Sequence, residues 1–143
     1  MIYTELTKKA MQIAYNAHHG TYDKGGTPYF LHPLYLAEQM TTEEETAAAL
    51  LHDVIEDTEV TAADLMNEGL PLSVINLVLL LTKQPSEDYF SYISRISENS
   101  AATRVKLADL KHNSDLSRLK QITEEDLERV EKYKKAIKIL SNE

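Results

Sequence analysis

Two short stretches of this sequence combine histidine with carboxylates, the side chains that can hold a divalent metal without thiolates. The first, LLHDVIEDT, contains four such residues: His52, Asp53, Glu56 and Asp57. On a single helix, His52 would share a face with Glu56, and Asp53 would share one with Asp57, because residues four apart are neighbours. These side chains fall away from the apolar stripe of the same helix. Two interpretations of these four residues remain open, a solvated acidic helix face and a metal-binding site.

The second stretch, RVKLADLKHNSD, places a carboxylate among apolar residues. On a helix, Asp109 shares a face with Val105 and Ala108. An ionised carboxylate in such surroundings costs free energy unless it is paired, hydrogen-bonded or bound to a metal. A salt bridge to a basic residue of another helix and a metal site would both meet that requirement. Asn113, one turn further on, would project beside Asp109.

A third histidine, His32, stands directly before Pro33 in the segment GGTPYFLHP. A proline in the first turn of a helix fixes the backbone and so aims the preceding side chain. Together with His52, Asp53 and Asp109, His32 offers two imidazoles and two carboxylates, a set suited to Mn, Fe, Co or Zn. We therefore expect one mononuclear metal site, which neighbouring helices must bring together.

The composition limits the kinds of chemistry. The chain contains no cysteine, which excludes disulfides, zinc–thiolate sites and a cysteine nucleophile. Its net charge of −8 argues against broad, non-specific binding of nucleic acid. An anionic substrate could still bind, provided that a metal or a local cluster of Lys and Arg supplies positive charge.

Helical periodicity and capping residues predict an all-α, single-domain helical bundle. The length of 143 residues and the hydrophobic content of 43% fit one compact domain with a core. No stretch alternates as a strand would, and the segment TYDKGGTPY is dense in turn residues. Helix 71–81 is apolar nearly all round, which predicts a central position. In the first half of the chain, we expect one helix from Thr4 to Gly20, a short one from Pro33 to about Met40, one that starts at TTEEE, and one from Thr61 to about Gly69. In the second half, we expect helices over 86–98, 100–119 and 123–140.

The sequence also predicts a cytoplasmic protein without a membrane partner. The segment MIYTELTKKAMQ has no apolar signal core. The most apolar run, 70–82, is too short to span a bilayer.

Three ordered blocks, GGTPYFLHP, AALLHDVIEDT and VKLADLKHN, resemble the HD-domain metal-dependent phosphohydrolases. More closely, and with support from AYNAHHG and LTK, the chain resembles the RelA/SpoT-type guanosine polyphosphate hydrolases in their short form, the small alarmone hydrolases. The resemblance implies a single HD-type hydrolase domain over 1–143, with a motif core at about 11–119. It leaves no room for the synthetase domain of the long relatives.

The resemblance also implies the roles of particular residues. The expected reaction removes pyrophosphate from the 3′ position of guanosine tetra- or pentaphosphate (ppGpp or pppGpp) and yields GDP or GTP. The usual ion is Mn²⁺, and Glu56 and Asp57 would support water activation and proton transfer. The implied metal ligands are His32, His52, Asp53 and Asp109, and the implied substrate-binding residues are Lys24, Tyr29 and Asn113.

Two departures from the family pattern leave the substrate open. Asp23-Lys24 stands where the family commonly has a basic pair, and Ser114-Asp115 follows Asn113 where a hydrophobic residue and arginine are usual. The same metal chemistry on ppApp, NADPH or a nucleoside triphosphate therefore remains an alternative, as does a non-catalytic nucleotide-sensing module. Which of Lys24, Lys106 and Lys111 meets phosphate is not decided by the sequence. Self-association is frequent among small relatives, so a homo-oligomer also stays open.

Overall fold

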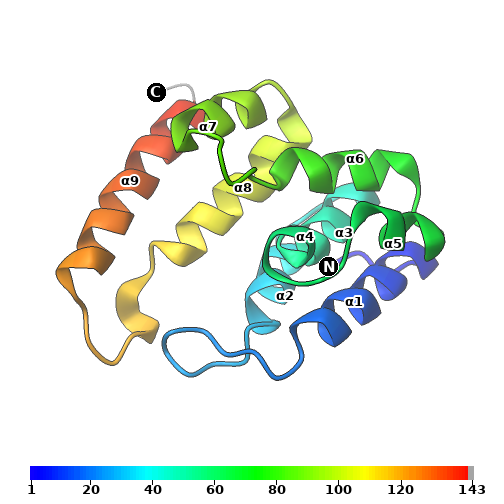
Figure 1. Ribbon diagram of the computed structural model, residues 1–143, viewed down its shortest axis with the longest axis horizontal. Helices are drawn as coiled ribbons and strands as arrows, with labels where there is room; N and C mark the ends of the chain where they lie inside the picture. Colours follow the sequence, from blue (N-terminus) through cyan, green and yellow to red (C-terminus); the bar gives the residue numbers. More distant parts are fainter. Residues whose placement is uncertain (142–143) are drawn as a thin grey trace.

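The computed structural model describes residues 1–141 and is all-α over that range (Figure 1). The predicted fold class is therefore confirmed, and the turn-rich loop contains an isolated β-bridge between Tyr22 and Pro28. The elements are α1 (Glu5–His18), α2 (Leu31–Glu38), α3 (Glu43–Leu51), α4 (Val54–Asp57), α5 (Ala62–Asn67), α6 (Leu72–Leu81), α7 (Tyr89–Ser97), α8 (Ser100–Asn113), the 3-10 helix η1 (Leu116–Arg118) and α9 (Glu124–Leu140).

Helix α3 forms the centre of the core. Its residues from Thr46 to Leu51 have no exposed surface, and it packs against α1, α2, α6 and α8. The three consecutive alanines Ala47, Ala48 and Ala49 allow these neighbours to approach closely, because small side chains keep helix axes near each other. The carboxyl end of α3, where His52 follows, therefore lies inside the molecule.

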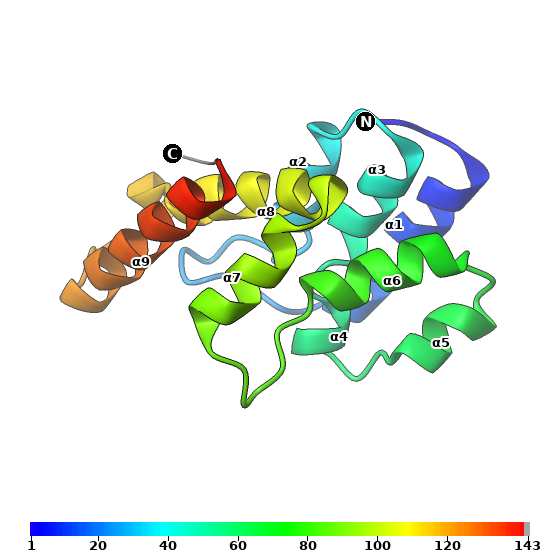
Figure 2. The ribbon, with the colours of Figure 1, turned by 90° about the horizontal axis from the view of Figure 1, so that it is seen from above.

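Helix α8 joins the two halves of the bundle. It contacts α2, α3 and α6 on one side and α7 and α9 on the other. Figure 2 shows α9 beyond α8, opposite the group formed by α1, α3 and α6. Asp109, in the middle of α8, is consequently held between helices from both parts of the chain.

Local capping explains several of the helix starts. Thr4 and Thr61 form capping boxes with Thr7 and Asp64, and Thr123 forms one with Asp126. The predicted starts after Thr4, at Thr61 and at 123 are confirmed. The predicted start in TTEEE is confirmed as well, because the Thr42 side chain caps α3.

Other boundaries differ from the prediction. Helix α7 begins at Tyr89, not at 86, since Asp88 caps it, and α8 ends at Asn113 instead of running to 119. Helix α2 starts two residues earlier than expected, at Leu31. Helix α6 is less central than its composition suggested, because Leu72 is 60% exposed.

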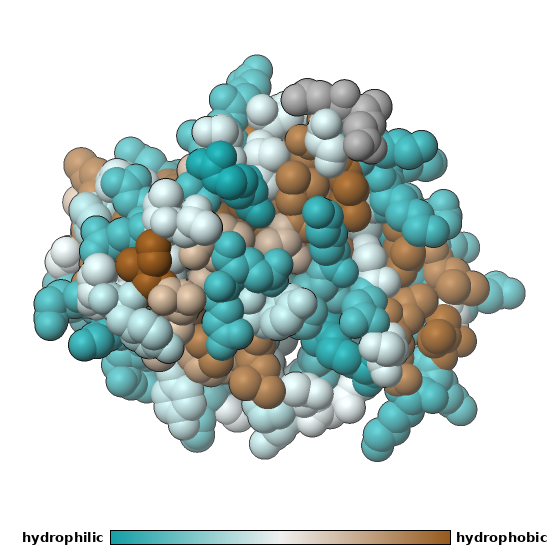
Figure 3. Space-filling model, turned by 180° about the vertical axis from the view of Figure 1, so that it is seen from behind, coloured by the Kyte–Doolittle hydropathy of each residue, from teal (hydrophilic) through white to brown (hydrophobic). Residues whose placement is uncertain are grey.

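The outside of the bundle is mixed. Figure 3 shows hydrophilic side chains over much of one face, with smaller hydrophobic areas between them. Within the described range, none of the helices combines the length and the apolar character needed to cross a bilayer.

Candidate active site

Three buried side chains from three segments converge in the interior. His32 lies on α2, His52 directly follows α3, and Asp109 lies on α8; each is about 4% exposed or less. One ligand atom of each lies within 4.8 Å of the others. His32 Nε2 is 2.8 Å and His52 Nε2 is 3.4 Å from the same oxygen, Asp109 Oδ1. These residues, which the sequence placed in one site, can hold a divalent metal ion.

The stretch LLHDVIEDT is not one continuous helix, contrary to the expectation. Helix α3 ends at Leu51 and α4 begins at Val54, with His52 and Asp53 in the turn between them. This break turns His52 into the core instead of leaving it on a solvated face. There the imidazole faces His32 of α2 and Asp109 of α8.

The proton arrangement of His52 fits a metal ligand. Its Nδ1 lies 2.7 Å from the carbonyl oxygen of Ala49, and it must donate there because a carbonyl oxygen only accepts. Nε2 is buried and makes no hydrogen bond within residues 1–141. In the neutral ring, this hydrogen bond leaves the lone pair on Nε2, directed towards the carboxylates, which is the arrangement of a metal-binding imidazole.

The carboxylates around His52 create a strongly negative environment. Burial disfavours the charged ring, but Asp53 and Asp109 raise the pKa of His52 well above its ordinary value. The Tyr29 hydroxyl donates a hydrogen bond to Asp53 Oδ2, and the same oxygen lies 3.0 Å from His52 Nε2. Asp53 therefore borders the group of three, and its role as a fourth ligand stays a prediction.

Asp109 accepts hydrogen bonds from several neighbouring side chains. Lys106 Nζ and Asn113 Nδ2 donate to its two oxygens over 2.8 and 3.0 Å. Burial acts against ionisation, but Lys106 and the two imidazoles hold the pKa of Asp109 well below its usual range. Among the described residues, the expected salt bridge to a basic residue of another helix is not found at Asp109, because its lysine partner, Lys106, lies three residues earlier on α8 itself. The metal-site interpretation stays a prediction, supported by the two histidines that face the same carboxylate.

The acidic pair lies on α4 beside the group of three. Glu56 and Asp57 line a cavity of about 220 Å³ together with Asp53 and Asp109. Glu56 Oε1 accepts a hydrogen bond of 2.9 Å from the backbone N–H of Lys83, which fixes the carboxylate in place. Burial, with Asp53 and Glu56 nearby, raises the pKa of Asp57 to about 6.

Lysines line the same cavity beside its carboxylates. Its lining includes Lys83, Lys106 and Lys132, of which the sequence analysis had singled out only Lys106. Lys111 does not line it. Lys83 is the lysine of the segment LTK, which contributed to the family resemblance but was given no role of its own. Lys132 lies on α9 and had no local signal.

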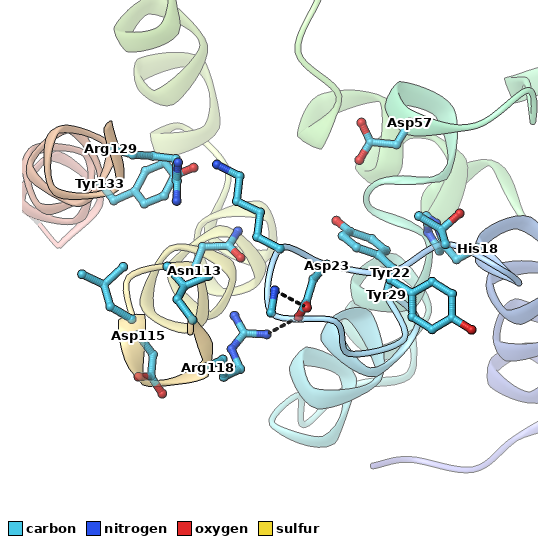
Figure 4. Close-up of a pocket in the computed structure, with 15 residues that line it drawn as sticks. His18, Tyr22, Asp23, Tyr29, Asp57, Asn113, Asp115, Arg118, Arg129 and Tyr133 are labelled. Carbon is cyan, nitrogen blue, oxygen red and sulfur yellow. Dashed lines mark hydrogen bonds and ion pairs between the residues drawn. The ribbon is translucent and has the colours of Figure 1, made fainter. Parts of the chain in front are cut away.

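A larger pocket of about 440 Å³ adjoins this cavity, with Tyr29, Asp57, Asn113 and Tyr133 lining both. All three residues expected to bind substrate, Lys24, Tyr29 and Asn113, line the larger pocket. Lys24 is exposed, and its Nζ lies 3.8 Å from Asp126 Oδ1. Two arginines that the sequence analysis missed, Arg118 and Arg129, also line it (Figure 4).

Comparison with known proteins places this arrangement in a family. The 3′-pyrophosphohydrolase for guanosine-3′,5′-bis(diphosphate) from Borreliella burgdorferi is 32% identical over 122 residues, which are 73% of this chain and 18% of that protein. The bifunctional (p)ppGpp synthase/hydrolase SpoT of Escherichia coli K12 is 34% identical over 121 residues, 74% of this chain and 17% of that protein. The chain thus spans less than a fifth of the length of these relatives.

A solved structure resembles nearly the whole chain. It is described as a metazoan ortholog of SpoT that hydrolyzes ppGpp, and it superposes with a TM-score of 0.78 at 26% identity, over 99% of this chain and 86% of the other. The model of the HD domain matches residues 10–138. Because that match covers most of the chain, the chain belongs to the HD domain family.

Proposed function

We propose that this chain is a metal-dependent hydrolase that removes the 3′-pyrophosphate from ppGpp or pppGpp to give GDP or GTP. The observation that carries the proposal is the position of the buried His–His–Asp group beside a lysine-lined cavity that adjoins a larger pocket. The names of the relatives and of the similar solved structure support the same substrate. We also propose that residues 1–143 act as one hydrolase domain, since α8 contacts helices from both halves of the chain.

The metal would be held by His32, His52, Asp53 and Asp109, and we propose Mn²⁺ as the ion. A divalent ion in such a site lowers the pKa of bound water and polarises a phosphoryl oxygen. The donor set fits, because two imidazoles and two carboxylates suit Mn²⁺ and related ions.

Glu56 and Asp57 would activate the attacking water and transfer its proton. Hydrogen bonding to the Lys83 backbone occupies only Oε1 of Glu56, so Oε2 remains to accept a proton from water or to orient it. Asp57 lines both cavities and can therefore reach the junction between the reacting phosphate and the rest of the nucleotide.

The lysines would bind the phosphates. Lys83 and Lys132 line the smaller cavity and would meet phosphate there, whereas Lys106 is paired with Asp109. Together with the metal, these lysines would balance the carboxylates that line the same cavity. The larger pocket, with Lys24, Tyr29 and Asn113, would take the nucleoside. Its volume of about 440 Å³ is in the range of pockets for small ligands.

The proposal can be tested by release of pyrophosphate from ppGpp by metal-free protein, with and without added Mn²⁺. We expect Mn²⁺-dependent release that Asp109→Asn abolishes and that the exposed control Glu131→Gln retains. Circular dichroism of both variants checks that they fold. Folded wild-type protein that binds Mn²⁺ but releases nothing from ppGpp, while hydrolysing ppApp or NADPH, would retain the chemistry and reject the substrate. Absence of Mn²⁺ binding would reject the proposal altogether.

A further inference from the structure

Two segments far apart in the sequence meet in the wall of the larger pocket. The loop between α1 and α2 contributes Asp23 and Gly25, and η1 contributes Arg118 (Figure 4). All three line the larger pocket only, whereas Asp53 and Asp109 line only the smaller cavity. This meeting point is therefore separate from the metal-binding group and lies where the nucleoside would bind.

The guanidinium of Arg118 is held at two corners. Its Nη1 donates to Asp23 Oδ2 and its Nη2 donates to the carbonyl oxygen of His112, each over 3.2 Å. Each of these nitrogens carries a second N–H. Arg118 is thus fixed in orientation and still has donors for a ligand.

Asp23 serves to position Arg118. Its Oδ1 accepts hydrogen bonds of 2.9 Å from the backbone N–H groups of Gly25 and Thr27, and its Oδ2 faces Arg118. The carboxylate is therefore committed to its own loop and to the guanidinium. Gly25 adds a second constraint, because a Cβ atom there would collide with the carbonyl oxygen of Arg118. Only glycine lets the loop and η1 pack this closely.

We propose that Arg118, positioned by Asp23, contacts the nucleobase of the substrate and favours guanine over adenine. The inference rests on the proposed function, in which this pocket takes the nucleoside. Arginine N–H groups match the O6 and N7 acceptors of guanine, whereas adenine presents an amino group in place of O6. Arg118 is therefore a specificity-determining residue, and Asp23 is a positioning residue.

The surroundings of Arg118 suit a base better than a phosphate. Its charge is largely neutralised by Asp23, which weakens its attraction for a 5′-diphosphate. Leu116 and Leu119 line the same pocket on either side of Arg118 in the sequence and offer apolar contacts for a flat ring. Lys24 is better placed for phosphate, because it lines the pocket, is exposed and, among the described residues, lies no closer than 3.8 Å to a carboxylate oxygen, that of Asp126.

The test measures kcat and KM for ppGpp and for ppApp with wild-type protein and four variants. We expect Arg118→Gln to lower kcat/KM for ppGpp about 10-fold or more, chiefly through KM, with a much smaller effect on ppApp. Arg118→Lys should recover little of the lost kcat/KM for ppGpp, since an ammonium lacks the planar fork of a guanidinium. Asp23→Asn should lower the ratio of kcat/KM for ppGpp to that for ppApp as well, but by less than Arg118→Gln. Lys120→Gln, an exposed neighbour outside the pocket, serves as the control and keeps the wild-type ratio. Mn²⁺ affinity stays unchanged in all four.

Three results would overturn the inference. The first is a ppGpp/ppApp ratio that Arg118→Gln leaves unaltered, and the second is wild-type protein that prefers ppApp. The third is an Arg118→Gln defect that disappears when the 5′-diphosphate of the substrate is shortened to a monophosphate, because Arg118 would then bind phosphate. If wild-type protein hydrolyses neither nucleotide, the proposed function fails by itself. Equilibrium binding of ppGpp and ppApp to metal-free protein then decides: equal affinities in wild type and Arg118→Gln reject the role of Arg118.

Discussion

The hydroxyl of Tyr29 donates a hydrogen bond to Asp53, linking the loop before α2 to the turn between α3 and α4. The same carboxylate oxygen lies 3.0 Å from His52 Nε2. Tyr29 thus orients a predicted metal ligand from outside the group, and it also lines both the smaller cavity and the larger pocket.

Removing this donor should weaken metal binding. We expect Tyr29→Phe to lower the affinity of metal-free protein for Mn²⁺ about 10-fold, because hydrogen-bond partners of ligands typically contribute 10- to 100-fold. Calorimetric titration measures the change. Tyr3→Phe, at a tyrosine that is 66% exposed, is the control. Equal affinities in the two variants would show that Asp53 needs no such support.

Glu56 should affect the chemical step and not the fold. Glu56→Gln keeps a carbonyl oxygen that can accept the Lys83 N–H but loses the basic carboxylate. We expect kcat to fall about 10²- to 10⁴-fold, the usual range for a general base, with an unchanged melting temperature. Steady-state kinetics and thermal unfolding test this, beside Glu59→Gln at an exposed neighbour. A drop of less than threefold would exclude Glu56 as the base.

The amino end of α9 should carry a pH-dependent part of the stability. Hydrogen bonds from the Thr123 backbone and from Arg129 lower the pKa of Asp126 to about 2, from an ordinary value of 3.8. Because the folded-state pKa is depressed, this contribution is present above pH 3.8 and is lost as the pH falls towards 2. Asp126→Asn should therefore lower the free energy of unfolding at pH 6 and lower it progressively less below pH 3.8.

Urea unfolding at several pH values follows this difference. Glu131→Gln, further along the exposed face of α9, should show no such trend. A destabilisation by Asp126→Asn that is constant across the acid range would contradict the assignment.

The central position of α3 predicts a large effect of truncation in its core. Leu50 is fully buried, so Leu50→Ala should lower the free energy of unfolding by about 2–5 kcal/mol. Leu72 on α6 is 60% exposed, and Leu72→Ala should change it by no more than about 0.5 kcal/mol. Urea unfolding of both variants compares them, and similar losses would place Leu72 in the core after all.

The local features of the fold were predictable because their causes are local. Capping by Thr61 and Thr123 depends on side chains three residues apart, and both boxes form as expected. The burial of Asp109 followed from the apolar residues around it on α8. The break at His52 was not predicted, and the partners that the buried imidazole meets there, His32 and Asp109, are distant in the sequence.

The parts of the site that come from distant segments escaped the sequence analysis. Lys132 on α9 lines the smaller cavity, and a lysine on a polar helix face looks the same in the sequence with or without that role. Lys83 belongs to the segment LTK, but its position in the cavity wall was visible only in the structure. Asp23 was noticed as a departure, but its partner Arg118 could not be named before the loop and η1 were seen together. Spacing along the chain carries no information on such contacts.

The most direct test of the account is the identity of the products. Phosphorus NMR of ppGpp incubated with Mn²⁺-loaded protein should show the 3′-diphosphate signals disappear while inorganic pyrophosphate and GDP accumulate in equal amounts. Release of orthophosphate, or loss of the 5′-diphosphate with the 3′-diphosphate intact, would contradict the proposed reaction.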